Sequence, residues 1–222
     1  MSPHNDNHHL IKYYDILRNL CRLEDGVMDE KIIILATNQL MNDENRELIL
    51  LIRKKIWLEY GPIEQNGKNA LLTEGLLKRL SLAKICINKV FYLCEKEPVL
   101  RKNLKMLLKS IEEYIDGMIP AQKLESVKNE KYSIFEELAY TEGYEKLSLI
   151  GLACVYAANI ALWDDLLLQD TSESDMDEDL DSFSWDTSYM ISLIYSMDFD
   201  HEYNRAKREE FWMWYLSVAK NI

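Results

Sequence analysis

The sequence predicts an all-α protein, a single-domain multi-helix bundle of about eight or nine helices over residues 1–222. Only seven Gly and four Pro occur in 222 residues, which is few turn-formers for many short strands. Leu, Ile, Lys, Glu and Ala supply helix-compatible positions throughout. Hydrophobic residues make up 48% and charged residues 29%, a balance that allows a sizeable buried core.

Nine helical segments are expected, after a tail at residues 1–8 that we expect to be disordered. Asp25-Gly26 breaks the first helix, Asp43 can cap the third, and Gly61-Pro62 ends it. The approximate ranges are 9–23, 29–41, 43–60, 70–97, 99–118, 134–141, 144–168, 186–196 and 204–222.

Pro and Gly also bound the middle helices. The segment 61–69 is the clearest early linker; Pro98 closes the long helix after it, and Pro120 ends the next one. Gly143 precedes an apolar helix whose uncharged run, 147–163, has only 17 residues. A membrane span needs about 20. This run therefore predicts a central buried helix of the bundle rather than a membrane segment.

The last two helices follow an acidic loop at 169–185. Asp186 has the position of an N-cap for the first of them. In the second, the aromatic and aliphatic residues of 211–219 cover an arc of roughly 200°, wider than a single core-facing stripe. This width predicts a helix wedged between two neighbours. The alternative is that one edge, such as Trp214, stays exposed as a binding anchor.

The negative charge of the chain is concentrated in one segment. The chain has 38 acids and 26 bases, a net charge of −12, and thirteen of the acids lie between Leu147 and Asn204, where no Lys or Arg occurs. Outside that segment, 25 acids and 26 bases nearly cancel. Such a field attracts basic surfaces and speeds their encounter. The charge pattern therefore favours a protein-binding role.

The acidic loop has two functional interpretations and one structural one. As a docking surface, it would steer a basic partner toward the aromatic residues that follow it. As a solvated loop, it would only aid solubility. The residues that we expect to contact a partner are Asp164, Asp165, Asp175, Asp177, Asp179, Asp181, Trp185, Asp186 and Trp214.

Calcium binding is the third interpretation of this loop. Asp175, Asp177, Asp179 and Asp181 fall at positions 1, 3, 5 and 7 of an EF-hand count, with Asp186 at position 12. Position 6 is Leu rather than the Gly needed for a sharp turn, and position 12 is Asp rather than the longer Glu. If the chain does not bind a basic protein, the alternatives are a calcium- or metal-responsive protein or a helical adaptor. Because of these two mismatches, we expect no dedicated metal site.

Patterns typical of enzymes and of nucleic-acid-binding proteins are missing. No phosphate-binding glycine motif, HExxH or GxSxG occurs, and the histidines stand at 4, 8, 9 and 201. We expect neither catalysis nor a cofactor. Arg53-Lys54-Lys55 and Arg101-Lys102 are expected on helix surfaces among acids, so binding to nucleic acid is not expected. The N-terminus shows no secretory signal, and the four cysteines predict buried thiols in a reducing cytoplasm.

The C-terminal third resembles a known family. Its order is an Ala-rich helix ending in Ala161-Leu162-Trp163-Asp164, an Asp-rich loop, Ser184-Trp185-Asp186, and a final helix carrying a KRxxFWxWYL pattern. This order resembles an all-α immunity protein family, the fifth of the numbered families, from bacterial polymorphic toxin systems. The matching positions are Trp163, Asp164, Trp185, Asp186, Arg208, Phe211, Trp212, Trp214, Tyr215 and Leu216.

The resemblance implies a cytoplasmic antidote that binds and neutralises a cognate bacterial toxin domain. It carries over no catalytic residue. A toxin with a basic surface would fit the acidic segment, and we expect a monomer or a weak homodimer. Before the segment that begins near Tyr144, only helical character and helix order agree with the family.

Overall fold

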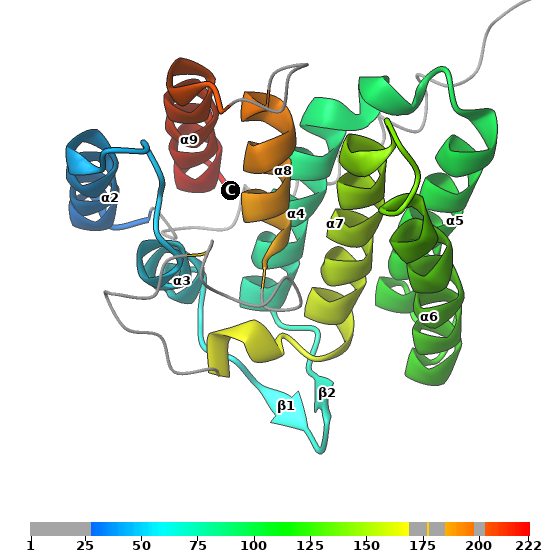
Figure 1. The fold of residues 1–222 in the computed structure, drawn as a ribbon. Helices are drawn as coiled ribbons and strands as arrows, with labels where there is room; N and C mark the ends of the chain where they lie inside the picture. The colour runs from blue at the N-terminus through cyan, green and yellow to red at the C-terminus, as the bar shows by residue number, and fades with distance from the viewer. Residues whose placement is uncertain (1–27, 169–176, 178–184, 198–202) are drawn as a thin grey trace, which may run out of the picture.

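The computed structural model describes residues 28–168, 177, 185–197 and 203–222 (Figure 1). The predicted tail, the predicted helix at 9–23 and most of the acidic loop lie outside these residues. Within them the chain is all-α apart from one short hairpin, which confirms the predicted fold class. The α-helices are α2 (Glu30–Asn42), α3 (Leu50–Glu59), α4 (Glu74–Val90), α5 (Pro98–Ile115), α6 (Ala121–Leu138), α7 (Glu145–Leu162), α8 (Thr187–Ser196) and α9 (Arg205–Lys220).

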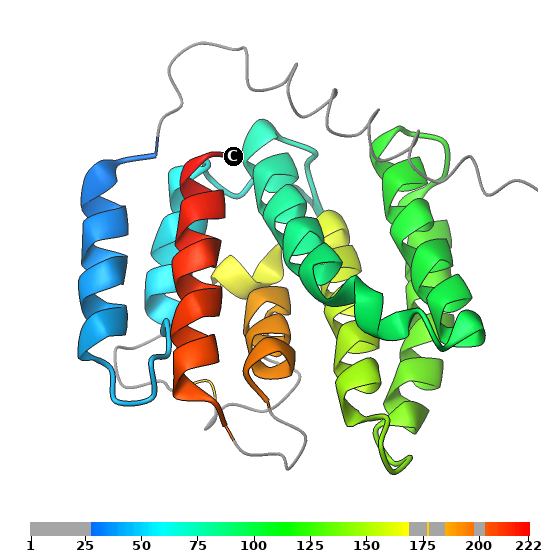
Figure 2. The ribbon, with the colours of Figure 1, turned by 90° about the horizontal axis from the view of Figure 1, so that it is seen from above.

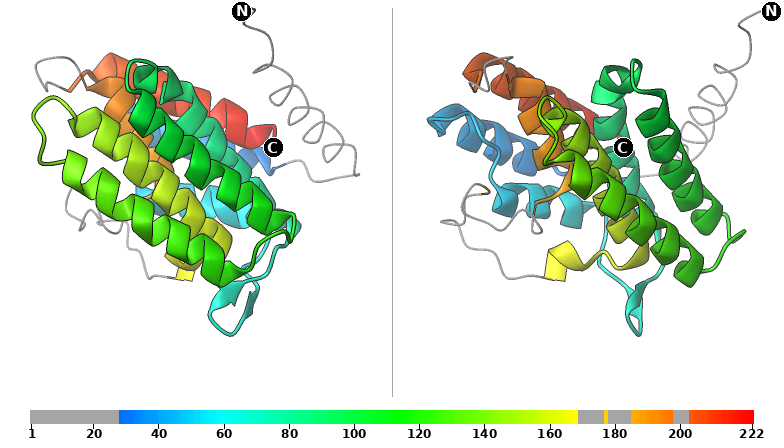
Figure 3. Two further views of the ribbon diagram at one scale, coloured as in Figure 1. Left: turned by 90° about the vertical axis from the view of Figure 1, so that its right-hand side faces the viewer. Right: turned by 45° about the vertical axis from the view of Figure 1, so that its right-hand side comes forward.

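Helix α7 occupies the middle of the fold and packs against α4, α5, α6 and α8. Helices α5 and α6 lie beyond it at one end, and α2, α3 and α9 lie at the other (Figures 1 and 2). The view in Figure 3 shows α5, α6 and α7 running side by side. By length and composition α7 could cross a membrane, but 56% of it is buried inside the fold. Its packing is that of the predicted core helix.

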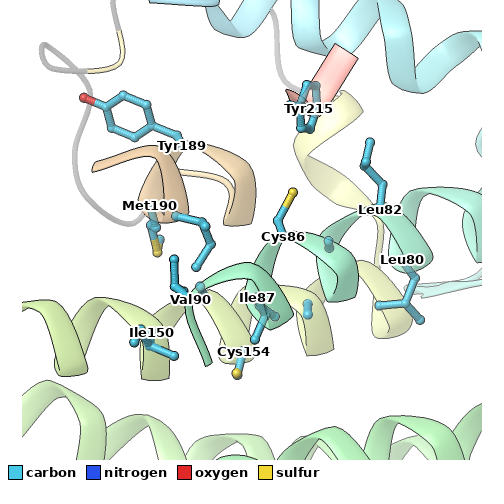
Figure 4. Packing of buried hydrophobic residues seen from close by; sticks show 14 of the residues in the cluster. Leu80, Leu82, Cys86, Ile87, Val90, Ile150, Cys154, Tyr189, Met190 and Tyr215 are labelled. Carbon is cyan, nitrogen blue, oxygen red and sulfur yellow. The ribbon is translucent and has the colours of Figure 1, made fainter. Parts of the chain in front are cut away.

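One continuous hydrophobic core joins α2 through α9. Figure 4 shows part of it, where Ile87 of α4 lies beside Cys154 of α7, Val90 lies near Met190 of α8, and Cys86 points to the opposite side of α4, toward Tyr215. Three thiols, Cys86, Cys94 and Cys154, are free and buried. Burial raises the pKa of Cys94 to about 11 and raises the pKa of Cys86 and Cys154 as well. These three thiols are buried, as predicted, and their raised pKa disfavours the reactive thiolate form.

The contact between α6 and α7 depends on Gly151. A Cβ atom built at this position would lie 2.2 Å from Phe135 Cγ, closer than any real contact. The absence of a side chain at Gly151 lets the buried ring of Phe135 rest directly on the backbone of α7. This close approach brings the lysines of α6 within reach of the end of α7, where Lys128 Nζ lies 4.0 Å from the ring centre of Trp163.

Several predicted boundaries were wrong. Helix α6 begins at Ala121 instead of near residue 134, because its buried face includes Lys128 and Lys131, which cover apolar surface with their aliphatic stems. Helix α3 begins at Leu50 instead of residue 43, because Asp43 accepts hydrogen bonds from the backbone amides of Asn45 and Glu47 in a turn.

The other boundary errors are smaller. The predicted linker 61–69 contains strand β1 (Gln65–Asn66), whose partner β2 is Asn69–Ala70, joined through Gly67 at φ 66°. Helix α4 gives way at Val90 to the 3₁₀ helix η1 (Phe91–Cys94), and α7 stops at Leu162, before the 3₁₀ helix η2 (Asp165–Leu168).

Candidate functional site

Four of the nine residues predicted to contact a partner lie where α7 ends and α8 begins. Asp164 and Asp165 follow the last turn of α7, and Trp185 and Asp186 precede the first turn of α8. Asp186 caps α8 as predicted, because its carboxylate accepts the backbone N–H groups of Ser188 and Tyr189. The helices α7 and α8 are neighbours, so the packing of the core fixes both pairs of residues at one end of the bundle.

A buried arginine of α3 binds two of the predicted aspartates. Arg53 Nε lies 3.0 Å from Asp186 Oδ2, and Arg53 Nη1 lies 2.9 Å from Asp177 Oδ2. All three side chains are buried. Burial lowers the pKa of Arg53, but the carboxylates of Asp177 and Asp186 outweigh this effect and raise it, so the guanidinium stays charged. Two aspartates of the acidic segment are therefore paired with one guanidinium inside the molecule.

This finding corrects the predicted placement of Arg53-Lys54-Lys55. The run was expected on a solvated helix surface, yet Arg53 and Lys54 are buried and only Lys55 is exposed. Arg53 lies within an apolar stripe of α3 formed with Ile49, Ile56 and Trp57. The spacing of this stripe was visible in the sequence and could have marked Arg53 as a core residue.

The family-like motif of α9 extends the same buried network. Arg208 donates to Glu47 and lies 3.3 Å from Ser196 Oγ. The ring of Tyr189 is in contact with both guanidinium groups, at 5.6 Å from Arg53 and 5.3 Å from Arg208. Trp212 covers Arg53 at 5.3 Å. These contacts satisfy buried charges with other charges and with aromatic faces.

Helix α9 is wedged between neighbours, as its broad apolar arc predicted. It packs on α8, α2 and α4. Phe211, Trp212, Tyr215 and Leu216 are buried, whereas Trp214 is only half-buried. Trp214 packs against Phe211, with ring centres 5.5 Å apart, and Lys89 Nζ lies 4.2 Å from its ring centre. Trp214 therefore lies on the α4 side of α9, within a local cluster.

A second buried ion pair fixes the end of α7. Arg79 of α4 donates to Asp164 Oδ2 from Nε at 2.9 Å and from Nη2 at 2.6 Å, and also to the carbonyls of Trp57 and Gly61. Asp164 has φ 49°, a left-handed conformation that Asp tolerates better than most residues. Burial raises the pKa of the Asp164 carboxyl, and Arg79 opposes this effect. The pair orients the turn between α7 and η2.

A cavity of about 120 Å³ lies between these two ion-pair clusters. Trp57, Arg79, Tyr156 and Asn159 contribute to its walls, although the sequence alone did not single them out. They come from three helices, so only the tertiary packing brings them together. Three of the predicted aspartates also line this cavity, namely Asp164, Asp165 and Asp186.

The described part of the predicted site also includes exposed groups. Asp165 is exposed, and Leu168 at the end of η2 is 57% exposed. Trp185 is half-buried, because its indole Nε1 donates to the carbonyl of Asp177 at 2.8 Å and its ring meets Tyr189 edge-on. Asp175, Asp179 and Asp181 lie outside the described residues.

The calcium interpretation loses two of its ligands. Asp177 and Asp186, at positions 3 and 12 of the EF-hand count, both bind Arg53. A guanidinium that occupies these carboxylates repels a cation. Among the residues that the structure describes, no group of three or more His, Cys, Asp or Glu side chains is placed to hold a metal ion.

Comparison with known proteins gives one finding about the whole chain. The family model described as immunity protein Imm5 matches residues 33–221. The match therefore runs from α2 through α9 and covers both ion-pair clusters and the cavity. No curated protein matches the chain.

Proposed function

The chain belongs to the Imm5 family of immunity proteins, and on this premise we propose that it neutralises a cognate toxin domain of a bacterial polymorphic toxin system by occlusion. The partner has a basic surface, complementary to the net charge of −12. Binding requires no catalytic group and no cofactor. The protein acts in the cytoplasm, as a monomer or weak homodimer, and does not engage nucleic acid or a membrane.

The observation that carries this proposal is the way in which the acidic segment is attached to the core. Asp177 and Asp186 bind the same guanidinium, that of Arg53. They bracket the part of the sequence that contains Asp179 and Asp181. Anchoring both ends of a segment lowers the conformational entropy that it loses on binding.

Eight of the nine predicted contact residues thus divide into two groups, and Trp214 belongs to neither. Asp164, Asp177 and Asp186 are buried and paired with Arg79 or Arg53, so their role is structural. Asp165 remains exposed beside the cavity. The toxin-binding surface that we propose consists of Asp165, the half-buried Trp185, which contacts Asp177, and the loop aspartates Asp175, Asp179 and Asp181. Trp214 lies on α9, apart from this surface. An interface of ordinary size would bury about 1,600 Å² in total.

Association kinetics test this surface. We expect Asp175, Asp179 and Asp181 changed together to Asn to slow association with the cognate toxin domain several-fold at low salt. The difference should shrink as salt rises toward 1 M, where the Debye length falls to about 3 Å. Stopped-flow fluorescence at several salt concentrations measures this. The melting temperature should change little.

A matched control removes the same charge elsewhere. Glu95, Glu137 and Glu142 are exposed and lie at the other end of the bundle, near the start of α7. Since α7 is 18 residues long, its two ends are about 27 Å apart, far beyond a Debye length in physiological salt. Changing these three to Gln should slow association much less. Equal slowing by both triple variants would show that net charge, and not this surface, steers the toxin.

A further inference from the structure

We propose that the cavity between the Arg53 and Arg79 clusters receives one arginine or lysine side chain of the toxin. This inference rests on the proposed function and specifies the partner's chemistry at its binding surface. The cavity opens beside the exposed carboxylate of Asp165 and extends inward to α4, α7 and α9.

The size of the cavity selects its occupant. Sites for cofactors and drug-sized ligands occupy about 300–1,000 Å³. This cavity has about 120 Å³, below the roughly 150 Å³ of an engineered cavity that holds a single benzene. It therefore accommodates the end of one side chain, such as a guanidinium or ammonium group with its last methylenes, and is too small for a nucleotide or a folded loop. Pockets that accept one anchoring side chain carry most of the binding energy in many protein interfaces.

The lining matches a long cationic side chain. Leu82, Ala83, Ile160, Leu166 and Leu167 supply apolar surface against which an aliphatic stem can pack. Asn159 supplies an acceptor, because its Oδ1 atom is buried and has no hydrogen-bond partner among the described residues. A buried acceptor without a partner costs about 1–3 kcal/mol, a cost that an entering N–H donor removes.

The charges around the cavity also favour a cationic side chain. Among the described residues that line the cavity, Arg79 is the one cation, and the carboxylate of Asp164 neutralises it. Asp186 is paired with Arg53, while Asp165 presents its carboxylate at the exposed rim. A cation that approaches the cavity meets an acidic rim and then an uncharged acceptor, whereas an anionic side chain meets repulsion at the rim.

The cavity is also held open in advance. Trp57 Nε1 donates to Tyr215 Oη at 2.7 Å, which fixes two of its walls. Arg79 fixes a third wall by binding Asp164 and the carbonyl of Trp57. Because ion pairs and packed aromatics set this shape before binding, little ordering is needed when a side chain enters.

Two substitutions test the proposal on the intact protein. Asn159→Leu removes the acceptor at similar size, and Ala83→Leu fills the cavity from α4. We expect each to weaken binding to the cognate toxin domain about 10- to 100-fold, the range for a lost hydrogen bond to a charged group. Asn103→Leu, a half-buried asparagine on α5, is the matched control and should leave the affinity unchanged. Isothermal titration gives the affinities, and thermal melts confirm folding.

A small probe makes the test independent of the toxin. We expect millimolar n-butylguanidinium to shift the NMR signals of Trp57 and Ile160, and 1-butanol to shift them much less; Asn159→Leu should abolish the effect. If wild type binds the toxin and Asn159→Leu binds it equally well, the cavity is not the receptor, although the proposed function stands. If wild type binds no toxin while the probe still enters the cavity, the proposed function is what fails. A probe that leaves both signals unmoved contradicts the inference.

Discussion

Replacing Arg53 by Met is expected to lower the free energy of unfolding by about 3–5 kcal/mol, because it leaves the carboxylates of Asp177 and Asp186 buried without a counter-charge. For a chain of this size, that corresponds to a fall of about 6–20 °C in melting temperature. Arg53 also contacts Trp212 and Tyr189, so aromatic packing is lost together with the ion pairs. Urea unfolding followed by circular dichroism measures the change.

The control is Lys55→Met, two residues along α3 on an exposed position. It removes the same charge and should change the stability by no more than about 0.5 kcal/mol. Adding Asp177→Leu to Arg53→Met should restore part of the loss, because it removes one of the unpaired carboxylates. Equal stability of the Arg53→Met and Lys55→Met variants would show that the buried pairs do not hold the acidic segment to the core.

Replacing Asp164 by Ala is expected to destabilise the protein by a similar amount, about 3–5 kcal/mol. It leaves Arg79 charged and buried, and it places Ala at φ 49°, where a Cβ without a polar group is strained. The raised pKa of Asp164 shows that burying its carboxylate is itself costly. The pair therefore adds little net stability when it forms, whereas removing one partner alone is expensive.

Asp164→Asn separates the two causes. The amide tolerates the left-handed backbone and can still accept from Arg79, so only the charge is lost. We expect this variant to fall between wild type and Asp164→Ala in chemical denaturation. Asp165→Asn, one residue later and exposed, should leave the stability unchanged. A stable Asp164→Ala protein that loses only toxin binding would contradict the structural role of Asp164.

Much of the fold could be predicted because helix ends carry local signals. Of the two caps named from the sequence, Asp186 accepts backbone N–H groups in the first turn of α8, as predicted, whereas Asp43 does not cap α3. Local signals failed where a charged residue occupies a buried position that an apolar residue would normally occupy. In α6, the buried lysines interrupt the apolar stripe, so its first half was not recognised as a helix. In α3, Arg53 was predicted to be exposed, although its neighbours in the stripe are apolar.

The position of the candidate site along the chain could be predicted, but the burial of its carboxylates could not. Composition located the acidic segment, and the family-like motif located Asp164, Trp185 and Asp186, which the structure places at the end of α7 and the start of α8. Neither indicates which carboxylates point inward, because that depends on Arg53 and Arg79, which are 133 and 85 residues away in the sequence from Asp186 and Asp164. Long-range pairing of this kind requires the tertiary structure.

The central claim is that the toxin binds at the end of the bundle where α7 meets η2. Backbone hydrogen exchange, measured by mass spectrometry on the protein alone and in complex with a cognate toxin domain, tests it most directly. We expect slower exchange in the complex at 163–168 and in the adjoining hairpin 65–70, whose Gln65 side chain donates to the carbonyl of Trp163. Protection confined to the outer faces of α5 and α6, with none at η2, would contradict it.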